Sequence, residues 1–357
     1  MSKVIFNDVV RRANTKEDKD NTEKEFYIGG EHIDSNEVLI TKRGMIAGST
    51  IGPMFYFGFT AGQVLLVSRN PHLRKAGMVT FDGICSEKTF VLESIDESIL
   101  LQRYLPFLLQ SDHFWSYAEA NKSGSVNFFI NWSTLAKYEF ELPSIAKQKE
   151  LSDLLWSIND TKLAYRNVIQ KTDELIKSQF IKMFGRINDE GFYIRKQWAE
   201  VLQIINGRSY KSVADDNGPY PVYGTGGIMG RASEYLCPEN SVVMGRKGTI
   251  DKPYIVEEKF WNVDTAFGVV ANPGVLHYLY LFWYCKQLDY TKLNKASTLP
   301  STTKADLLKL WINIPPYELQ EQFATIVHKA DKSKLELKQI IATTEALYRN
   351  ILAENFD

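Results

Sequence analysis

The sequence matches itself at an offset of 172 residues, and this internal repeat constrains the fold more than any other feature. The string LPSIAKQKEL at 142–151 aligns with IPPYELQEQF at 314–323, which sets Gln148 against Gln320. Upstream of these strings the offset drifts while the order of matching segments is kept, as loop insertions would produce. We therefore interpret the chain as two copies of one unit, residues 1–186 and 187–357, each a variable globular part followed by a better-matched tail.

Both tails have the apolar periodicity of long helices, with steps alternating between three and four residues and no glycine or proline between Ala146 and Gly185. A stripe of this period over about five heptads predicts a coiled-coil seam. Residues 144–189 carry eight basic and six acidic side chains and 316–357 carry five and seven, so opposite net charges favour pairing of the two helices. The alternative is that each helix packs only on its own globular part. The stripe residues are Leu154, Ile158, Tyr165, Val168, Leu175 and Met183 in the first copy, and Phe323, Ile326, Ala330, Leu337, Ile340, Leu347 and Ile351 in the second.

The globular parts have the pattern of short strands separated by turns rich in Gly, Pro, Asn and Asp. Helical stretches are fewer, and the candidates are Leu100–Tyr117 and Gly274–Leu288, at matching places in the repeat. The class predicted is α+β: two mixed α/β domains separated by two long helices that form a coiled coil, as an internal pseudo-twofold repeat. The predicted parts are a domain at 1–143, a helix at 144–189, a second domain at 190–315 and a distal helix at 316–357. The predicted strands are Glu37–Thr41, Gln63–Val67, Thr89–Leu92, Ser241–Met244 and Ala266–Val270.

Length and composition limit the number of domains and the cellular compartment that we expect for this protein. With 357 residues, 44% of them hydrophobic, the chain is long enough for two or three domains with their own cores. The N-terminal segment lacks the apolar run of a signal peptide and no apolar run is long enough to cross a bilayer, so we expect a cytoplasmic protein without a membrane partner. Three cysteines without paired spacing predict buried thiols rather than disulfides or a zinc site. The net charge of −1 does not by itself indicate a polyanion partner, so any polyanion-binding site must come from a local patch of basic residues.

No string of the sequence predicts a catalytic or metal centre. The NIPPY string at 313–317 is similar to the Asn-Pro-Pro-Tyr motif of amino-methyltransferases, but the inserted Ile314 favours a proline pair that breaks the chain before a helix. The glycine cluster from Tyr223 to Gly230 lacks dinucleotide-binding spacing and is predicted to be a flexible loop. Asp251, Glu257 and Lys259 could form a metal-dependent nuclease triad, and this remains an alternative. We expect no cofactor and no metal in this chain, and we expect that it is not itself an enzyme.

Polar and basic side chains interleaved with aromatics and glycines gather in predicted turns at corresponding places in both copies. Arg pairs with guanine edges, while Ser, Thr, Lys and backbone amides hold phosphates, so these turns are candidate contacts with double-stranded DNA. In the first copy the candidates are Lys42, Arg43, Arg69, Arg74, Lys75 and Ser125. In the second they are Arg208, Ser209, Tyr210, Lys211, Tyr223, Arg246, Lys247, Thr249, Ser301, Thr302 and Thr303, with Ser297 and Thr298 nearby.

The order of these strings resembles the specificity (S) subunit of type I restriction-modification enzymes. The strings are FDGICS at 81–86, SVVMGRKGTI at 241–250 and the two domain-ending signatures ELPSIAKQKEL and NIPPYELQEQF, each leading into a helix with glutamine in its first turns. The resemblance covers essentially the whole chain. It departs in that the chain is short for the family and Glu150 stands where the second signature has Gln322.

The resemblance implies that this chain recognises DNA and that its partner subunits carry out the catalysis. Two target-recognition domains would each read one half of a split, asymmetric DNA sequence, and two antiparallel helices would set the distance between them. Modification subunits, expected to be two, would dock on this chain and carry S-adenosylmethionine, and restriction subunits would join them. The alternatives are a stand-alone metal-dependent nuclease and a coiled-coil scaffold with two binding heads that does not bind DNA.

Overall fold

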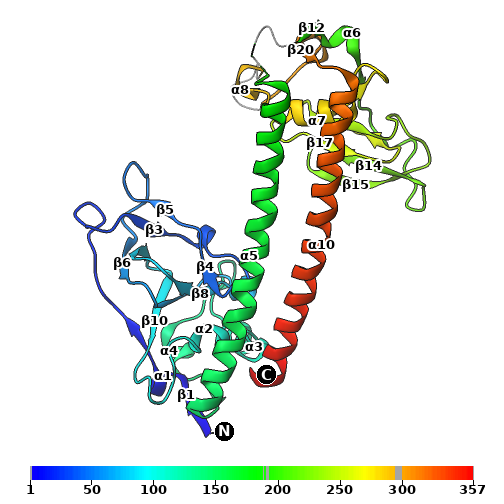
Figure 1. Ribbon diagram of the computed structural model, residues 1–357. Helices are drawn as coiled ribbons and strands as arrows, with labels where there is room; N and C mark the ends of the chain where they lie inside the picture. Colours follow the sequence, from blue (N-terminus) through cyan, green and yellow to red (C-terminus); the bar gives the residue numbers. More distant parts are fainter. Residues whose placement is uncertain (1, 188, 190–192, 294–299, 357) are drawn as a thin grey trace. The chain divides into compact units, whose positions relative to one another are not determined.

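The computed structural model describes residues 2–187, 189, 193–293 and 300–356 (Figure 1). Residue 190, Ser297 and Thr298, which the sequence analysis singled out, lie outside these ranges. The chain divides into two compact units, unit 1 (Met1–Arg166 and Gln339–Asp357) and unit 2 (Asn167–Lys338). The boundary residues Arg166 and Lys338 lie 172 positions apart, which is the offset of the sequence repeat. Each unit therefore contains one globular part and one half of each long helix.

Unit 1 is built from short strands and helices around three small sheets. Its strands are β1 (Ser2–Ile5), β2 (Val10–Ala13), β3 (Phe26–Ile28), β4 (Leu39–Ile40), β5 (Gly44–Met45), β6 (Phe55–Phe59), β7 (Val64–Val67), β8 (Ala76–Val79), β9 (Gly83–Ser86), β10 (Thr89–Ser94) and β11 (Glu139–Leu142). Its short helices are α1 (Phe6–Val9), η1 (Gly30–His32), η2 (Pro71–Leu73), α2 (Leu105–Leu108), α3 (Asp112–Ala120) and α4 (Trp132–Leu135).

Unit 2 is built in the same way. Its strands are β12 (Ile194–Gln197), β13 (Leu202–Asn206), β14 (Tyr220–Gly224), β15 (Gly227–Ala232), β16 (Ser241–Gly245), β17 (Tyr254–Val256), β18 (Trp261–Asn262), β19 (Ala266–Ala271) and β20 (Trp311–Ile314). Its short helices are α6 (Trp198–Val201), α7 (Tyr278–Cys285), α8 (Tyr290–Leu293) and α9 (Lys304–Leu307). The long helices shared by both units are α5 (Ile145–Phe184) and α10 (Tyr317–Phe356).

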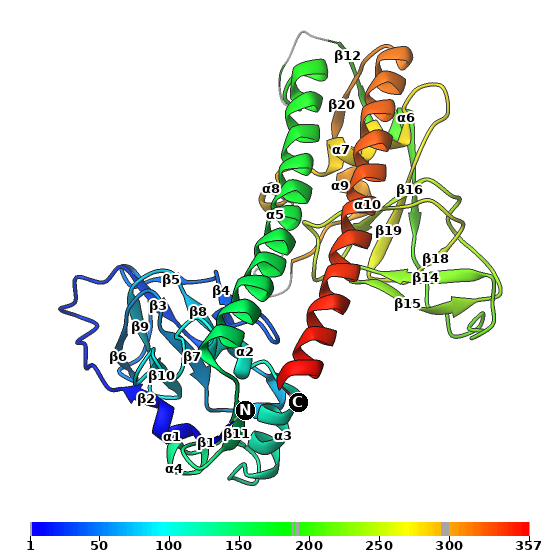
Figure 2. The ribbon, with the colours of Figure 1, turned by 60° about the horizontal axis from the view of Figure 1, so that its bottom comes forward.

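The two units have equivalent sheet topologies. In unit 1, β10 pairs antiparallel with β2 and β7, and β7 with β8; in unit 2, β19 pairs antiparallel with β13 and β16, and β16 with β17. The second sheets also correspond, since β3 pairs parallel with β9 and antiparallel with β5, as β14 does with β18 and β15 (Figure 2). Unit 1 has two further strands without a counterpart in unit 2, β4 at the edge of the first sheet and β6 at the edge of the second. The mixed α/β class expected from the sequence is confirmed.

The predicted strands and helices occur with small differences in length. All five predicted strands are present, as β4, β7, β10, β16 and β19, although β4 is only two residues long. The predicted helix Leu100–Tyr117 is divided into α2 and α3, because Ser111 forms an N-cap that accepts a hydrogen bond from the backbone N–H of Phe114 (3.1 Å). The single long helix expected there is therefore wrong.

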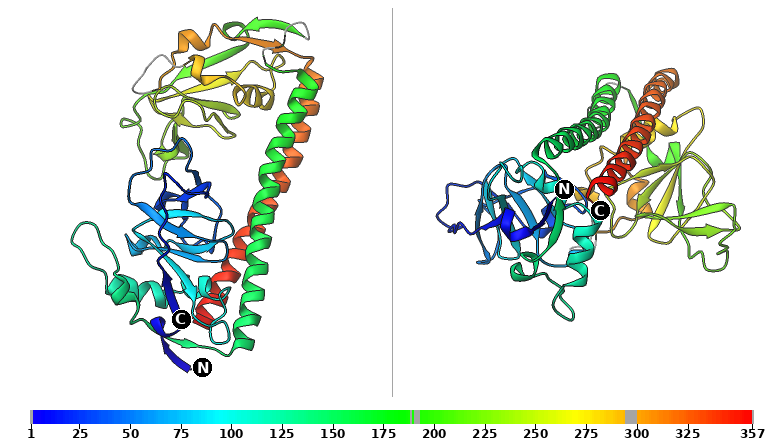
Figure 3. Two further views of the ribbon diagram at one scale, coloured as in Figure 1. Left: turned by 90° about the vertical axis from the view of Figure 1, so that its left-hand side faces the viewer. Right: turned by 90° about the horizontal axis from the view of Figure 1, so that it is seen from below.

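Within each unit, α5 and α10 run antiparallel, side by side (Figures 1 and 3). In unit 1, Leu155 packs with Leu352, and Arg166 Nη2 pairs with Glu345 Oε1 at 2.8 Å. In unit 2, Lys334 Nζ pairs with Asp173 Oδ1 at 2.7 Å, and Phe180 stacks edge-on against Phe323. Residue numbers fall on α10 as they rise on α5, as the family resemblance implied. Helix α5 ends where Gly185 adopts a φ of +77°, which favours glycine.

Part of the predicted apolar seam is wrong. Six of its members are exposed, and burial instead falls largely on neighbouring residues such as Leu155, Ile176 and Phe180. The physical reason is that these buried side chains face the globular part of their unit as well as the other helix, so the packed face is shifted from the 3.5-residue stripe. The exposed stripe residues are Leu154, Val168, Leu175, Ile326, Ile340 and Leu347.

Gln148 and Gln320 join each long helix to its globular part through the same three hydrogen bonds, and both are fully buried. Gln148 Oε1 accepts from the backbone N–H of Leu101, and its Nε2 donates to the carbonyl oxygens of Ile99 and Pro143, each at 2.9 Å. The corresponding partners of Gln320 are the N–H of His277 (2.8 Å) and the carbonyl oxygens of Val275 (3.1 Å) and Pro315 (2.9 Å). These bonds explain why glutamine recurs in both domain-ending signatures.

All three cysteines are buried free thiols, as the sequence predicted. Burial raises the pKa of the Cys85 and Cys237 thiols to about 12. Burial likewise raises the pKa of the Cys285 thiol. These thiols are therefore neutral at physiological pH and act as small apolar side chains.

Candidate nucleic-acid interface

Several predicted DNA-binding residues of unit 2 meet at one end of its main sheet. Strands β13 and β16 end there and the antiparallel strand β19 begins there, since Asn206 pairs with Phe267 and Gly245 with Ala266. We call this surface the polar edge of unit 2. It consists of residues 207–211, 246–249, 262–266 and 300–303.

Backbone hydrogen bonds hold these segments together. The N–H of Arg246 donates to the carbonyl oxygen of Thr265 (2.8 Å), and the N–H of Thr302 donates to the carbonyl oxygen of Arg246 (3.0 Å). The N–H of Gly248 donates to the carbonyl oxygen of Pro300 (3.0 Å). On the other side of the turn, the N–H of Arg208 donates to the carbonyl oxygen of Asn262 (3.0 Å). The structure thus brings together four segments that are separate in the sequence.

The basic side chains of this edge carry charge that the described part of the chain does not neutralise. Arg208, Lys211 and Lys247 are exposed and Arg246 is half-buried, and none of them forms an ion pair with a described acidic residue. Arg246 Nη1 makes one long hydrogen bond (3.4 Å) to the carbonyl oxygen of Asp264, and the guanidinium lies 5.9 Å from the centroid of the Phe267 ring. An arginine whose fork is not paired with a carboxylate is available for a phosphate or a guanine edge.

The hydroxyl-bearing residues of the edge contribute mainly to its framework. Thr302 is buried, and its Oγ1 donates to the carbonyl oxygen of Gly245 (3.0 Å). Thr303 is the N-cap of α9, since its Oγ1 accepts from the N–H of Asp306 (3.2 Å). Ser301 pairs through its backbone with Lys247, whereas Ser209 and Thr249 are exposed. As DNA contacts, these residues stay predictions.

The glycine cluster that begins at Tyr223 is not the flexible loop predicted from the sequence. It forms the β14–β15 hairpin, because Gly227 adopts a φ of +114° in the turn and Tyr223 pairs with Ile228 across the strands. Tyr223 is half-buried. Burial, followed by the charge of Glu258, raises the pKa of its phenol, so Tyr223 is a neutral hydrogen-bond donor. Tyr210 is also half-buried and packs against Val222 and its neighbours.

Unit 1 has a polar edge with the same backbone frame, made of residues 68–70, 87–88 and 127–130. The N–H of Ser68 donates to the carbonyl oxygen of Lys88 (2.8 Å), as Arg246 does to Thr265. The N–H groups of Asn70 and Ile130 donate to the carbonyl oxygens of Phe128 (2.8 Å) and Ser68 (2.9 Å), as those of Gly248 and Thr302 do in unit 2. A cavity of about 490 Å³ opens at this edge, between Arg69, Lys88 and Phe129. The frame is shared and the side chains on it differ.

The remaining predicted residues of unit 1 are held by other parts of that unit. Lys42 Nζ pairs with Asp34 Oδ1 (2.6 Å), and the Arg43 guanidinium lies 3.9 Å from the centroid of the Phe26 ring. Lys75 Nζ donates to the carbonyl oxygen of Gly30 (2.5 Å), while Ser125 is exposed. Only Arg69 of the unit 1 predictions falls within the polar edge as defined above.

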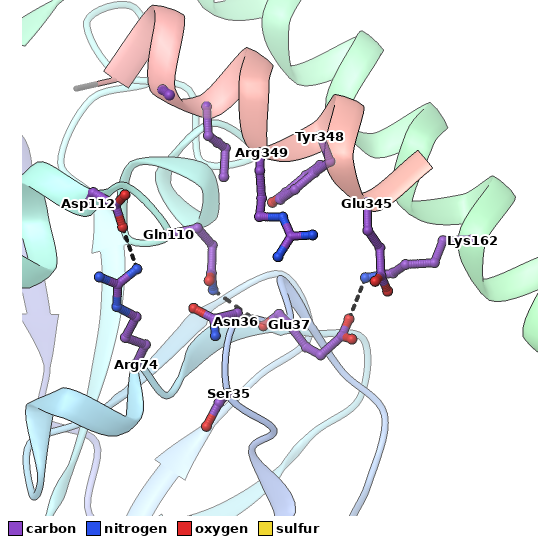
Figure 4. Close-up of a pocket in the computed structure, with 12 residues that line it drawn as sticks. Ser35, Asn36, Glu37, Arg74, Gln110, Asp112, Lys162, Glu345, Tyr348 and Arg349 are labelled. Carbon is purple, nitrogen blue, oxygen red and sulfur yellow. Dashed lines mark hydrogen bonds and ion pairs between the residues drawn. The ribbon is translucent and has the colours of Figure 1, made fainter. Parts of the chain in front are cut away.

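Arg74 lines a different cavity, of about 390 Å³, where it forms an ion pair with Asp112 (Figure 4). Gln110 and Glu37 face this cavity from the globular part, and Tyr348 and Arg349 face it from α10. Glu37 pairs with both Lys162 (2.7 Å) and Arg166 (2.9 Å) of α5. These ion pairs stabilise the contact between the globular part of unit 1 and its helix segments.

Four residues of the two edges were missed from the sequence: Glu87, Lys88, Asp264 and Thr265. They lie directly before β10 and β19, which pair antiparallel with β7 and β16, so they must lie beside the turns that follow those strands. The repeat contained this signal, but a search for clusters of basic residues in turns passes over acidic and neutral positions and over a single lysine such as Lys88. Asp264 is exposed next to Arg246, and a carboxylate there can accept a hydrogen bond from a cytosine amino group.

The residues of the alternative nuclease triad are all exposed, Asp251 after β16, and Glu257 and Lys259 after β17. Lys259 Nζ lies 5.0 Å from the centroid of the Tyr235 ring. In the described ranges, no three His, Cys, Asp or Glu side chains are grouped so that they could hold a metal ion. None of the described helices is both long enough and apolar enough to cross a bilayer.

Comparison with known proteins finds a sequence match in the second half of the chain and a structural match over the whole chain. Residues 195–345 match the model of the type I restriction modification DNA specificity domain. The S subunit of a type I restriction-modification system from M. genitalium has a similar structure, with a TM-score of 0.61 and 13% identity over 100% of this chain and 96% of that one. A chain from a structure on complex assembly and conformational transition of the type I R-M system has a TM-score of 0.58 and 17% identity, over 99% and 97%. No curated protein matches the sequence.

Identities of 13% and 17% establish the fold, and the family model adds the sequence evidence for the second recognition domain and most of α10. Residues 195–345 thus match the DNA specificity domain of type I restriction-modification systems, the whole chain has the fold of their S subunits, and the resemblance seen in the sequence is confirmed.

Proposed function

We propose that this chain is the cytoplasmic, non-catalytic specificity subunit of a type I restriction-modification complex, and that its two polar edges read the two halves of a split DNA target. Modification subunits that bind S-adenosylmethionine would dock on it and methylate the target, and restriction subunits would join the complex. The chain itself needs no cofactor in this role. The helices α5 and α10 would set the distance between the half-sites.

The observation that carries this proposal is the pair of polar edges. Three backbone hydrogen bonds are the same in both, but Ser68 of unit 1 corresponds to Arg246 of unit 2, and Lys88 corresponds to Thr265. Because base pairs are read by side-chain donors, acceptors and methyl groups, different side chains on one frame favour different sequences. The two half-sites are therefore expected to differ, which makes the target asymmetric.

Exposed apolar side chains on the long helices support the docking of two copies of one partner. Unit 1 exposes Leu154 (45%), Ile340 (43%) and Leu347 (52%), and unit 2 exposes Ile326 (37%), Val168 (47%) and Leu175 (58%) at the positions that the 172-residue offset makes equivalent. A set of exposed apolar residues that recurs in both units favours two equivalent contacts.

The test of the function is DNA binding by the complex assembled from this chain and its modification subunits. A specificity subunit should prefer one split sequence, and its affinity should fall steeply as salt rises, because basic side chains displace counterions from the phosphates. A complex that binds all sequences alike, or whose affinity does not depend on salt, would contradict the proposal and favour the scaffold alternative.

Arg246→Ala is expected to weaken binding of the assembled complex to its target by about 1–3 kcal/mol if Arg246 pairs with a guanine, and to relax preference at one position of one half-site. Competition binding with single-base variants of the target measures both effects. Lys259→Ala, which removes an exposed cation outside the polar edge, is the control. A variant complex whose affinity equals that of the native complex on every target would remove Arg246 from the interface.

Leu175→Ser and Leu347→Ser are expected to weaken one docking contact each, because they remove equivalent exposed side chains in the two units. Native mass spectrometry should show that each variant retains one modification subunit preferentially and that the double variant retains neither at the same concentration. Val126→Ser, at an 83% exposed residue in a loop of unit 1, is the control. Full occupancy in the double variant would place the docking surface elsewhere.

A further inference from the structure

The β14–β15 hairpin presents two apolar side chains to solvent at its tip. Ile228 is 66% exposed and Met229 is 57% exposed. Strand β15 is the edge strand of its sheet, and the turn passes through Gly227 in a conformation suited to glycine. Because these apolar side chains are exposed at the end of the hairpin, replacing them would remove no contact from the core. The stability of the fold therefore does not account for them.

A β-bulge directs these side chains. The pairing of β14 with β15 shifts between Val222 and Tyr223, so that Val222 lies opposite Gly230, Tyr223 opposite Ile228, and Met229 has no partner. The Met229 side chain lies over Gly224, where a Cβ would come within 2.5 Å of its Sδ. Bulges of this kind reorient a side chain and occur at sheet edges and beside functional sites.

The hairpin tip adjoins the polar edge of unit 2. The N–H of Val263 donates to the carbonyl oxygen of Tyr223 (3.0 Å), and Val263 also lies against Gly224. The segment 262–266, which binds Arg208 and Arg246 through its backbone, therefore contacts the hairpin as well. Residues 224–230 of the tip carry no charge, whereas Arg208, Lys211, Arg246 and Lys247 beside it are cationic.

We propose that the tip of this hairpin enters the major groove of the second half-site and that Ile228 and Met229 contact thymine methyl groups there. The inference rests on the proposed function, since it assumes that the polar edge of unit 2 binds DNA. The occupant is duplex DNA because the cations around the tip complement phosphates, while the uncharged tip suits the apolar part of a base edge. A two-stranded ribbon fits the major groove, and the thymine methyl is the apolar group exposed in that groove.

The experiment combines changes in the protein with removal of the methyl group from the DNA. The assembled complex is prepared with the native chain, with the double variant I228S/M229S and with the control I194S, which changes a 74% exposed residue on β12 of the same unit. Binding is measured on the target and on targets in which uracil replaces thymine at single positions of the half-site read by unit 2. That half-site is the one whose preference changes in Arg246→Ala.

We expect uracil at one or two of these positions, each tested singly, to reduce the affinity of the native complex by about 4-fold, the effect of one buried methyl group. The double variant should bind the thymine target with the affinity that the native complex has for the uracil target, and it should no longer distinguish the two. The control should behave as the native complex. Circular dichroism and thermal unfolding should be unchanged in both variants, because the side chains are exposed.

Two results would overturn the inference while leaving the proposed function intact. One is a complex that binds its split target specifically but shows no sensitivity to uracil in that half-site, which includes a half-site without an A·T pair. The other is a double variant that keeps the native sensitivity to uracil. Loss of specific binding by the native complex itself would instead contradict the proposed function.

Discussion

Gln320→Leu is expected to lower the free energy of unfolding of unit 2 by about 3 kcal/mol or more. The leucine fills a similar volume but leaves three backbone groups, the part-buried N–H of His277 and carbonyl oxygen of Val275 and the buried carbonyl oxygen of Pro315, without the partner they have in the native protein. Each buried polar group left unsatisfied costs about 1–3 kcal/mol. The loss should be seen as a lower midpoint in thermal or urea unfolding and as faster hydrogen exchange at the His277 amide.

Gln148→Leu should have the same effect on unit 1, because Gln148 makes the equivalent three bonds. Gln170→Leu is the matched control, since Gln170 is an exposed glutamine on α5 whose side chain makes one long hydrogen bond, to Glu174 (3.4 Å). Surface changes of this kind stay within about 0.5 kcal/mol. If either buried variant unfolded at the same midpoint as the control, the glutamine pair would not be what joins the long helices to the globular parts.

Lengthening both long helices is expected to change the spacing of the DNA target and leave its half-sites unchanged. Insertion of four residues near Gln170 in α5, and of four near the equivalent Ala342 in α10, adds about 6 Å to each helix and turns it through roughly 400°. The helices then meet with nearly the same faces, as at a coiled-coil stutter. Since base pairs are spaced at about 3.4 Å along a strand, the preferred gap between half-sites should grow by one or two base pairs.

Binding assays on targets whose half-sites are moved apart one base pair at a time measure this effect. The control is a four-residue insertion between Ser125 and Val126, in an exposed loop of unit 1, which should leave the gap unchanged. An unchanged gap after lengthening of the helices, or an altered half-site sequence, would show that α5 and α10 do not set the distance.

Much of the architecture followed from the repeat alone. The offset of 172 residues predicted two copies of one unit, and the same offset separates the boundaries of the two compact units. Strands such as β7 and β16 could be predicted because β-branched and aromatic runs bounded by turn residues are a local signal. Most of α5 and α10 could be predicted because helix-breaking residues are missing from long periodic segments.

The apolar seam shows where local periodicity fails. The sequence assigned Leu154 and Leu175 to a buried stripe, yet they are exposed and their neighbours Leu155 and Ile176 are buried. In a helix that packs on a domain as well as on another helix, the buried face is shifted toward the domain, and stripe positions on the opposite side can then face solvent. Sequence spacing cannot distinguish these cases, because both place apolar residues three and four apart.

What the sequence determined by itself is the repeat, the alternation of variable and helical parts, and the family they resemble, because these depend on order along the chain. Only the tertiary structure decided which candidates lie together: Arg246, Lys247 and Ser301 meet on one edge with the missed residue Asp264, while Arg74 faces a cavity with Asp112. It also showed that the glycine cluster is a hairpin whose tip exposes Ile228 and Met229. The physical reason is that strand pairing joins segments far apart in the chain, and the alignment of one strand end with another depends on contacts between them rather than on the residues of either segment.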